Sequence, residues 1–512
     1  MRVSFALSAH LVAFLLAGSF GFVACVGDTP AAPLPDGGTD GGDAGGPEAG
    51  GDGGVDAGPP AATATHQWVK LLGGQTASGI ATDAQGNSYV TGQFSGAQID
   101  FEKTKLSSSG STDIYVMKLD PKGVVTWVVA FGGTLDDQAE AIAVDDAGDV
   151  YLSGNFRSTT LTIGNTIALA GGGGTRAGFV AKIKGADGTG QWAAVMGGGS
   201  TYCPKLAAGA GIVAAGCRYD GGTFANPKAT LTSFGSSDGA VVAFDPSGTV
   251  KWATGIGSGS VDSVDAVAVG PSGDILVMGA MYGTPLRFTS DTAAYAKKGA
   301  GYNDAFVTRL SFGEGKPSWG VIWGSSSQGN VFPGVAATRS NDLAIGGIFY
   351  GGGDLGVGGA TPTVGQTDSF VVKFDVAAQK TTWAKTVGGT DTNGTYSENT
   401  VGVAVDPWGD VIAVGLTDTA DCKADGNVIP GPADGLGYGM WAVKYAPSGT
   451  VLWAKGIPPV GSGDRVYVAG VAAAPNGDVR IVGTLNGSAK LDRTNVVASN
   501  GSVQMFVMGW SP

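Results

Sequence analysis

One tryptophan recurs along most of this chain at intervals that suit a small β-sheet. It stands in similar surroundings each time, such as WVVAFGG, WATGIGS and WAKTVGG, and successive copies are 59 to 70 residues apart. The seven copies are Trp68, Trp127, Trp192, Trp252, Trp319, Trp383 and Trp453. Because repeats of this length fold as similar units packed side by side, this spacing constrains the fold more than any single motif does.

Each unit contains four short apolar segments separated by turn signals such as DDAGD and DPKG. The first segment, as in AIAVD, has alanine at positions 81, 143, 207, 268, 336, 404 and 472. The second has glycine at positions 92, 154, 216, 279, 347, 415 and 483. The third carries a large residue at Tyr115, Phe179, Phe306, Phe370, Trp441 and Phe506, whereas the third unit has Ala240 there. Four strands per unit are therefore expected.

Seven such units predict an all-β fold, a seven-bladed β-propeller of four-stranded blades. The alanine column suits the innermost strand, where blades crowd around the axis, and the aromatic columns suit the wider gaps further out. The glycine column allows a bulge or a close backbone approach. A solenoid would leave edges that need caps, and the sequence offers none.

The order of the strands predicts how the ring closes. The repeats begin with the outer strand around Trp68 and end with a third strand, Met505 to Trp510. The N-terminal strand is therefore expected to complete the last blade.

The repeats resemble a known bacterial family. The segments GGTLDDQAEAIAVDDAGDVYLSGNF and DIYVMKLDPKGVVTW are similar to SBBP-type seven-bladed β-propeller repeats, over about residues 67–512. The resemblance implies a secreted or surface protein and no defined activity. The turn FDPSGTVKW also resembles the tryptophan-docking repeat of quinoproteins.

The N-terminus predicts export. Residues 1–24 read as a lipoprotein signal peptide, and Phe22-Val23-Ala24-Cys25 resembles a lipobox, which implies lipidation of Cys25. A plain signal peptide with an incidental cysteine is the alternative. Residues 25–66 are expected to form a disordered Gly/Asp/Pro linker, and residues 67–512 the propeller. No later run reaches the length of a membrane span. We expect a lipid-anchored protein of the outer membrane, on its periplasmic side or at the cell surface.

Composition excludes several functions. The chain carries 43 acidic and 30 basic residues, without basic clusters, which argues against nucleic-acid binding. Its two histidines, His10 and His66, precede the repeats, so a Ser-His-Asp or His-ligated metal site in the ring is not expected. No set of groups suits a quinone cofactor. Cys203 and Cys217 flank the short hairpin of the third unit and are expected to form a disulfide.

Acidic residues recur where the chain enters each first strand. The column five residues before the first apolar position reads Gln75, Asp137, Thr201, Asp262, Asn330, Glu398 and Val466, with Asp136, Glu140, Asp265, Asp391 and Asp464 nearby. These residues are expected around one mouth of the channel. A solvated loop face, a site for Ca²⁺ or a basic partner, and a catalytic carboxylate pair are the three interpretations.

The leading hypothesis is a non-enzymatic envelope scaffold, a monomer that needs no cofactor apart from the Ca²⁺ considered above. It would bind an envelope protein or a glycan through its long loops, 94–112, 156–177, 281–303 and 417–438. Two alternatives are open: a carboxylate-dependent enzyme acting on polysaccharide, and a structural subunit of an outer-membrane assembly complex.

Overall fold

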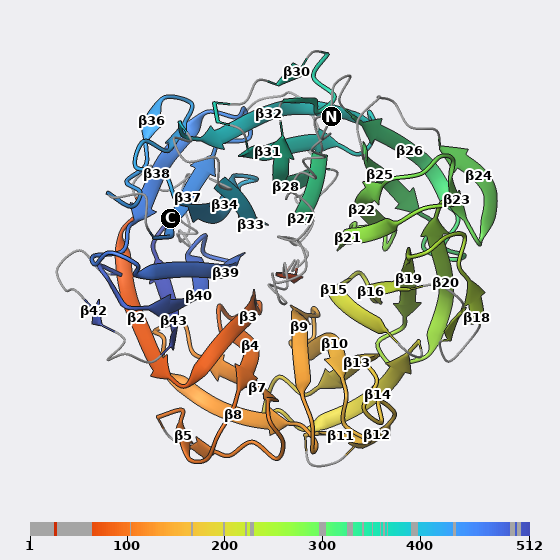
Figure 1. Cartoon of the computed structure of the whole chain (residues 1–512), viewed down its shortest axis with the longest axis horizontal. Coiled ribbons are helices and arrows are strands. Elements are labelled where there is room, and N and C mark those ends of the chain that lie inside the picture. The colour runs from red at the N-terminus through yellow and green to blue at the C-terminus, as the bar shows by residue number, and fades with distance from the viewer. Residues whose placement is uncertain are drawn as a thin grey trace, which may run out of the picture.

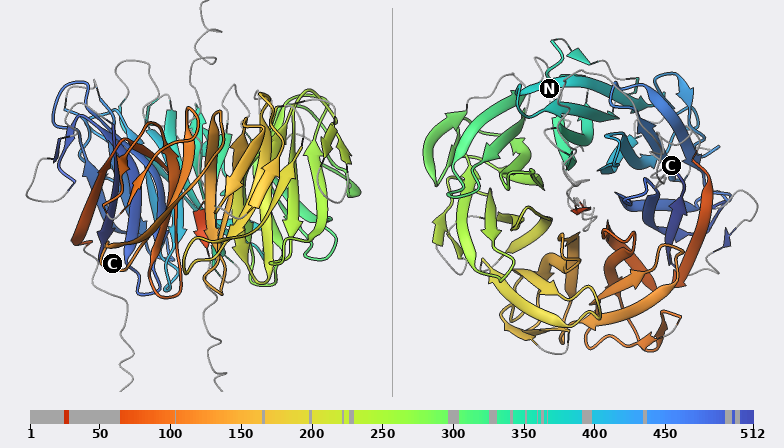
Figure 2. Two further views of the ribbon diagram at one scale, coloured as in Figure 1. Left: turned by 90° about the horizontal axis from the view of Figure 1, so that it is seen from below. Right: turned by 180° about the vertical axis from the view of Figure 1, so that it is seen from behind.

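In the computed structural model, seven small antiparallel sheets stand around a central axis (Figure 1). Seen from the side, the ring is a thick disc whose strands run between two faces (Figure 2). The structure describes residues 25–27 and 64–512, apart from short gaps at 103, 165–166, 198–199, 221–222, 226–229, 296–303, 325–330, 340–341, 351, 359, 362–363, 366, 391–397, 434–436, 492–496 and 499–502.

Each blade has four main strands, ordered outward from the axis. The first strands are β3 (Gln75–Thr82), β9 (Asp137–Val144), β15 (Thr201–Gly209), β21 (Asp262–Val269), β27 (Val331–Arg339), β33 (Glu398–Val405) and β39 (Arg465–Ala473). The second strands are β4 (Ser88–Phe94), β10 (Val150–Phe156), β16 (Ile212–Tyr219), β22 (Ile275–Met281), β28 (Asp342–Tyr350), β34 (Val411–Thr417) and β40 (Val479–Asn486).

The third strands are β7 (Asp113–Leu119), β13 (Ala177–Ile183), β19 (Asp238–Phe244), β25 (Asp304–Leu310), β31 (Thr367–Asp375), β37 (Gly439–Tyr445) and β43 (Gln504–Trp510). The outer strands are β8 (Val125–Phe131), β14 (Gly190–Met196), β20 (Val250–Gly257), β26 (Pro317–Trp323), β32 (Lys380–Gly388), β38 (Val451–Ile457) and β2 (His66–Gly73). We number blades 1 to 7 by their first strands, β3 to β39. The predicted fold is thus confirmed. A short strand, β1 (Cys25–Gly27), pairs in parallel with β15.

The ring closes as predicted, because β2 pairs with β43 and becomes the outer strand of blade 7. Within other blades a covalent turn joins the third and outer strands; in blade 1, Asp120 N donates to Val124 O at 2.9 Å. Val124 N donates to Asp120 Oδ1 at 2.9 Å. The two chain ends reproduce both bonds: Ser511 N donates to Thr65 O at 2.7 Å, and Thr65 N donates to Ser511 Oγ at 3.2 Å. The two strands of blade 7 therefore meet with the hydrogen bonds of the usual turn, although no covalent link joins them there.

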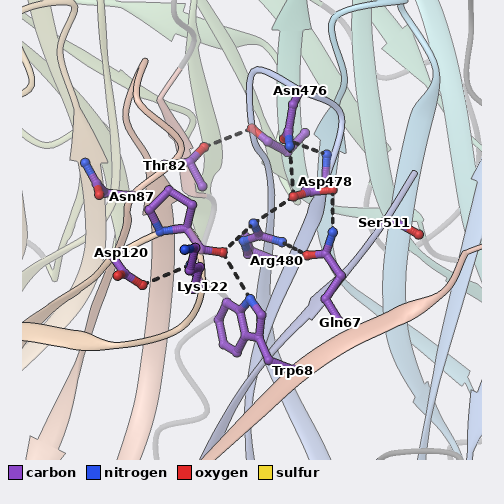
Figure 3. A network of polar contacts seen from close by, with 12 residues as sticks. Gln67, Trp68, Thr82, Asn87, Asp120, Lys122, Asn476, Asp478, Arg480 and Ser511 are labelled. Carbon is purple, nitrogen blue, oxygen red and sulfur yellow. Dashed lines mark hydrogen bonds and ion pairs between the residues drawn. The ribbon is translucent and has the colours of Figure 1, made fainter.

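A buried arginine holds this closure (Figure 3). The Arg480 side chain is 1% exposed and donates to Gln67 Oε1 at 3.1 Å and Asp478 Oδ2 at 2.9 Å. It also donates to Pro121 O at 3.2 Å in blade 1, where the Trp68 indole donates at 3.1 Å. The network therefore joins β2, β40 and the first blade.

The tryptophan column lies at the junctions between blades. The indole of Trp127 donates to Gly185 O, that of Trp192 to Pro246 O and that of Trp252 to Phe312 O, at 3.2, 3.1 and 2.9 Å. Each acceptor lies in the turn between the third and outer strands of the next blade. Each of these three tryptophans therefore ties one blade to the next, as the aromatic columns predicted.

The glycine column accommodates a bulge in the first strand of each blade. Pairing slips between Ala77 and Gly79 of β3, and between equivalent residues in the other six blades. A Cβ on Gly92 would lie 1.9 Å from Thr76 O, and one on Gly279 would lie 1.9 Å from Ser263 O. At Gly92 and Gly279, only glycine leaves room for the carbonyl that the bulge turns toward it.

In blade 3 the glycine column was misplaced at Gly216. The position that pairs with Ala240, as Gly92 pairs with Tyr115, is Cys217. Cys217 forms a disulfide with Cys203, the residue that corresponds to Ala77. The reason for the shift is the two-residue turn Ala210-Gly211, with φ values of 46° and 72°, which shortens the hairpin. The disulfide occupies the space that an aromatic ring fills elsewhere.

Each blade also carries a small hairpin between its second and third strands. The hairpins are β5–β6 (Ile99–Asp100, Lys105–Leu106), β11–β12 (Thr160–Ile163, Ile167–Ala170), β17–β18 (Thr223–Ala225, Thr230–Thr232), β23–β24 (Leu286–Phe288, Asp291–Tyr295), β29–β30 (Gly353–Asp354, Ala360–Thr361), β35–β36 (Lys423–Ala424, Asn427–Val428) and β41–β42 (Ser488–Ala489, Val497–Ala498). They lie at the perimeter of the ring (Figure 1).

Five hairpins pair with the outer-strand region of the preceding blade. The pairs are Ile256 with Phe288, Val387 with Ala424, Gly132 with Thr162, Gly324 with Asp354, and Pro459 with Ala489. Three of the four long loops that were expected to form a recognition face, 156–177, 281–303 and 417–438, therefore contain a hairpin that pairs with the preceding blade.

Residues 1–24 and most of the linker lie outside the described residues. Strand β2 begins at His66, one residue before the expected boundary, and Ala64 is already buried at 3% exposure. Across the described ranges, we find no helix long and apolar enough to cross a membrane.

Candidate functional site

We call the face with the connections between second and third strands the loop face. Three candidate acids on this face are buried. Asp137 and Asp262 are 0% exposed and Glu398 is 2% exposed. Asp137 accepts hydrogen bonds from Arg157 N, Ser158 N and Ser158 Oγ, at 3.2, 3.3 and 2.7 Å. These contacts fix the loop after β10, so the side chain does not project into the channel mouth.

The other two acids have similar surroundings. Asp262 accepts from Ser258 N at 2.6 Å and Tyr282 N at 3.2 Å. Glu398 accepts from Thr417 Oγ1 at 3.0 Å and from Thr419 Oγ1. Burial raises the pKa of all three carboxyls, and that of Glu398 to about 8. A neutral glutamic acid is therefore the main form of Glu398 near pH 7.

A second acidic column, which the sequence interpretation missed, faces the first. The third strands begin with Asp113, Asp238, Asp304 and Asp368, which are 2% exposed or less. Burial raises the pKa of Asp113, Asp238 and Glu398. A neighbouring acid adds to each rise: Asp137 for Asp113, Asp262 for Asp238 and Asp368 for Glu398. The signal was available, because an aspartate recurs at the start of four third strands. These pairs lie at junctions between blades and stabilise loops.

The remaining acids are dispersed. Asp136 is half-buried and accepts from Ser111 Oγ, while Asp464 accepts from Gly461 N at 2.8 Å and Ser488 N at 2.9 Å. Asp391 lies outside the described residues. In the described part of the chain, no three His, Cys, Asp or Glu side chains gather as a metal site. Asp137 and Asp262 already accept N–H and O–H donors, which are not the surroundings of a cation ligand.

Glu140 and Asp265 belong to a different group, which reaches the channel mouth. They lie at the bulges of β9 and β21, on either side of Lys205 in β15. Together with loop and strand-end residues of blades 2 to 4 they form what we call the mouth cluster: Glu140, Arg176, Tyr202, Lys205, Arg218, Asp265 and Tyr282.

Contacts link the members of the mouth cluster. The Arg176 guanidinium lies 5.8 Å from the centre of the Tyr202 ring. Arg218 Nε donates to Ser237 Oγ at 2.8 Å and lies 3.5 Å from Asp220 Oδ1. Arg218 also interacts with Tyr202 and Tyr282. One continuous group of cations and aromatic rings thus spans three blades.

Acidic and basic side chains lie close together in the mouth cluster and offset each other's charge. Burial raises the pKa of Glu140, and Lys205 and Arg176 oppose that rise. Burial likewise raises the pKa of Asp265, and Lys205 opposes it. Lys205 is 4% exposed, whereas Tyr282 is 39% exposed. Lys205 is therefore the buried, ionic part of the cluster, and Tyr282 is its accessible aromatic part.

A separate pocket of about 500 Å³ lies at the perimeter between blades 6 and 7. Its lining includes Ala64, His66, Ile457, Leu491 and Trp510, next to the start of β2. It contains none of the candidate acids.

The fold and its repeats define this chain as a seven-bladed β-propeller. Residues 67–93 match the model of the SBBP family, described as a beta-propeller repeat. The resemblance to SBBP-type repeats is therefore confirmed. No curated protein matches the sequence.

Several solved propellers are similar in part. The WD40 propeller domain of Doa1 covers 87% of this chain and 96% of its own, at 10% identity and a TM-score of 0.41. The Dos1 propeller covers 86% and 94%, at 9% identity and a TM-score of 0.41. Quinohemoprotein alcohol dehydrogenase from Comamonas testosteroni covers 87% and 76%, at 12% identity and a TM-score of 0.33. Similarities this low support no conclusion about function.

Proposed function

We propose that this chain is a non-enzymatic binding scaffold of the cell envelope. It is exported, lipidated at Cys25 and anchored to the outer membrane by lipid alone, on the periplasmic side or at the surface. It acts as a monomer and binds an envelope protein or a glycan, and not nucleic acid. The lipobox-like sequence before Cys25 and the acidic composition support this assignment.

The mouth cluster is the observation that carries the proposal. Tyrosine and arginine side chains are the types that dominate binding energy at interfaces. Here they come from blades 2 to 4 and lie beside one another, while the hairpins lie at the perimeter of the ring (Figure 1). A rigid ring that presents such a group suits recognition more than chemistry.

Capture from detergent-solubilised envelope tests the proposal. Full-length protein is compared with the triple variant Arg176→Ala, Arg218→Ala and Tyr282→Ala, and bound material is identified by mass spectrometry and glycan analysis. Arg287→Ala, an exposed arginine on β23, is the matched control. We expect a partner that is lost with the triple variant and kept with the control. A partner retained by both variants would contradict this site.

The enzymatic alternative rested on Asp137, Asp262 and Glu398. All three side chains are buried and hydrogen-bonded to loop residues, which does not favour a catalytic role. Alanine at these three positions is expected to lower stability. No polysaccharide-cleaving activity should be lost, because the parent protein is expected to have none. Cleavage of a polysaccharide by the parent protein, abolished by these changes in a folded variant, would favour the enzyme. Binding of Ca²⁺ near Asp136 or Asp464 stays a separate prediction, tested by calorimetry with CaCl₂.

A further inference from the structure

The cations of the mouth cluster stand out in a protein of net charge −13. Arg176 precedes β13, Lys205 lies in β15, and Arg218 lies in β16. Lys205 is held between Glu140 and Asp265, which balance its charge. The Arg218 side chain is 36% exposed and Arg176 is half-buried, whereas Lys205 is 4% exposed. The surface that a ligand meets first is therefore cationic and aromatic.

Arg176 has hydrogen-bonding capacity that the protein leaves unused. Its Nε is buried, and within the described residues no acceptor lies within hydrogen-bond distance of it. A buried N–H group without a partner costs free energy, so an acceptor supplied by a ligand would be favoured. Arginine matches a carboxylate in particular, because two parallel N–H groups meet two oxygens.

Aromatic rings beside the arginines favour a ligand with an apolar face as well as a charge. Tyr202 lies under Arg176, and Tyr282 exposes 39% of its surface near Arg218. The C–H face of a pyranose ring suits such a surface, while its hydroxyl groups suit Glu140 and Asp265 as hydrogen-bond partners. Asn155 already donates to Glu140 Oε1 at 3.1 Å, which keeps that carboxyl in place.

We infer that the mouth cluster binds an acidic oligosaccharide, with a carboxylate of the sugar at Arg176 and Arg218 and a sugar ring on Tyr282. This inference rests on the proposed binding function and specifies its ligand class. It favours a glycan over a protein as the ligand, because a protein would need a broader surface than these residues offer.

Calorimetric titration of the full-length protein in detergent tests the ligand class. Tetragalacturonic acid is the acidic probe and maltotetraose the neutral probe. We expect binding of the acidic probe, at least tenfold weaker binding to Arg176→Ala, and a comparable loss with Tyr282→Ala. Tyr282→Phe, which keeps the ring, should retain binding, and Arg287→Ala should behave as the parent.

Each other result has a distinct meaning. No binding of tetragalacturonic acid, or equal binding of both probes, overturns the acidic-sugar inference. If envelope capture still yields a protein that the triple variant loses, the scaffold proposal stands and that protein is the ligand. If neither experiment responds to the mouth cluster, both proposals fail. Equal melting temperatures of parent and variants ensure that any loss reflects the site and not unfolding.

Discussion

At the scale of single residues, Arg480 is the side chain on which closure of the ring depends most. It is buried, pairs with the buried Asp478 and bridges Gln67 to Pro121. Breaking a buried ion pair by removing one partner leaves an uncompensated charge. Arg480→Met should therefore lower the free energy of unfolding by about 3–5 kcal/mol, measured by chemical denaturation. Arg287→Met, on an exposed site of β23, should leave it unchanged. An equal effect of the two would refute the role of Arg480.

The disulfide between Cys203 and Cys217 gives a second prediction. It closes a loop with a sequence separation of 14 and occupies the position of an Ala–Gly pair and its aromatic neighbour. Cys203→Ala with Cys217→Gly should cost about 3 kcal/mol of stability. Adding Ala240→Phe supplies the ring present in other blades and should restore part of that loss. No difference in melting temperature between the double and triple variants would contradict the equivalence.

Glu398 predicts a dependence of stability on pH. Burial raises the pKa of its carboxyl from its ordinary value of 4.5 to about 8. Between these values the unfolded chain releases the proton and the folded chain keeps it, so stability falls as pH rises through this range. Asp238, with a pKa raised to about 6 by burial, acts in the same direction at lower pH. Denaturation from pH 5 to pH 8 should give a smaller fall for Glu398→Gln than for the parent. An unchanged slope would mean that Glu398 ionises normally.

At the scale of strands and turns, the tryptophan of blade 6 lacks the contact that Trp192 makes with the next blade. Trp192 donates to Pro246 O, in the turn of blade 3. Trp453 would require such a turn in blade 7, where the chain ends meet, and its Nε1 has no acceptor among the described residues. Trp192→Phe should cost about 1 kcal/mol more than Trp453→Phe, because only Trp192 leaves a carbonyl without its donor. Equal losses in denaturation would show that packing of the ring alone decides the effect.

The sequence predicted these elements because small and aromatic residues recur at fixed positions. The Trp, Ala and aromatic columns follow directly from the space between blades, and the strand order alone predicted that Trp68 joins the last blade. The hairpins could not be predicted in the same way, since pairs such as Ile256 with Phe288 form between blades. The glycine column of blade 3 was placed at Gly216 and not at the neighbouring Cys217, because a shorter turn shifts the register.

The candidate site was predicted only in part. The acidic column was recognised, and Glu140 and Asp265 do lie in the mouth cluster. Sequence spacing could not distinguish them from Asp137 and Asp262, because the distinction depends on a bulge that turns one residue of the strand toward the channel. Arg176 comes from a loop whose position depends on the fold as a whole. The aspartates that begin the third strands were recognisable as a column, although their pairing with the first column was not.

At the scale of the whole molecule, seven blades behave as one ring because a single strand closes it without a covalent turn. The split turn between Ser511 and Thr65 keeps the hydrogen bonds of the intact turns, and strand β2 carries Gln67 and Trp68 into the Arg480 network. The rigid placement of the mouth cluster across three blades depends on this ring. The linker that follows Cys25 is proposed to join the ring at the start of strand β2.

Thermal unfolding of the full-length protein and of a variant lacking residues 67–74 tests this closure most directly. The account predicts a loss of several kcal/mol, seen as a clearly lower melting temperature, because β43 and Arg480 lose their partners. A synthetic peptide covering residues 64–74 should restore part of the loss when added to the variant. An unchanged melting temperature of the variant would contradict closure by β2.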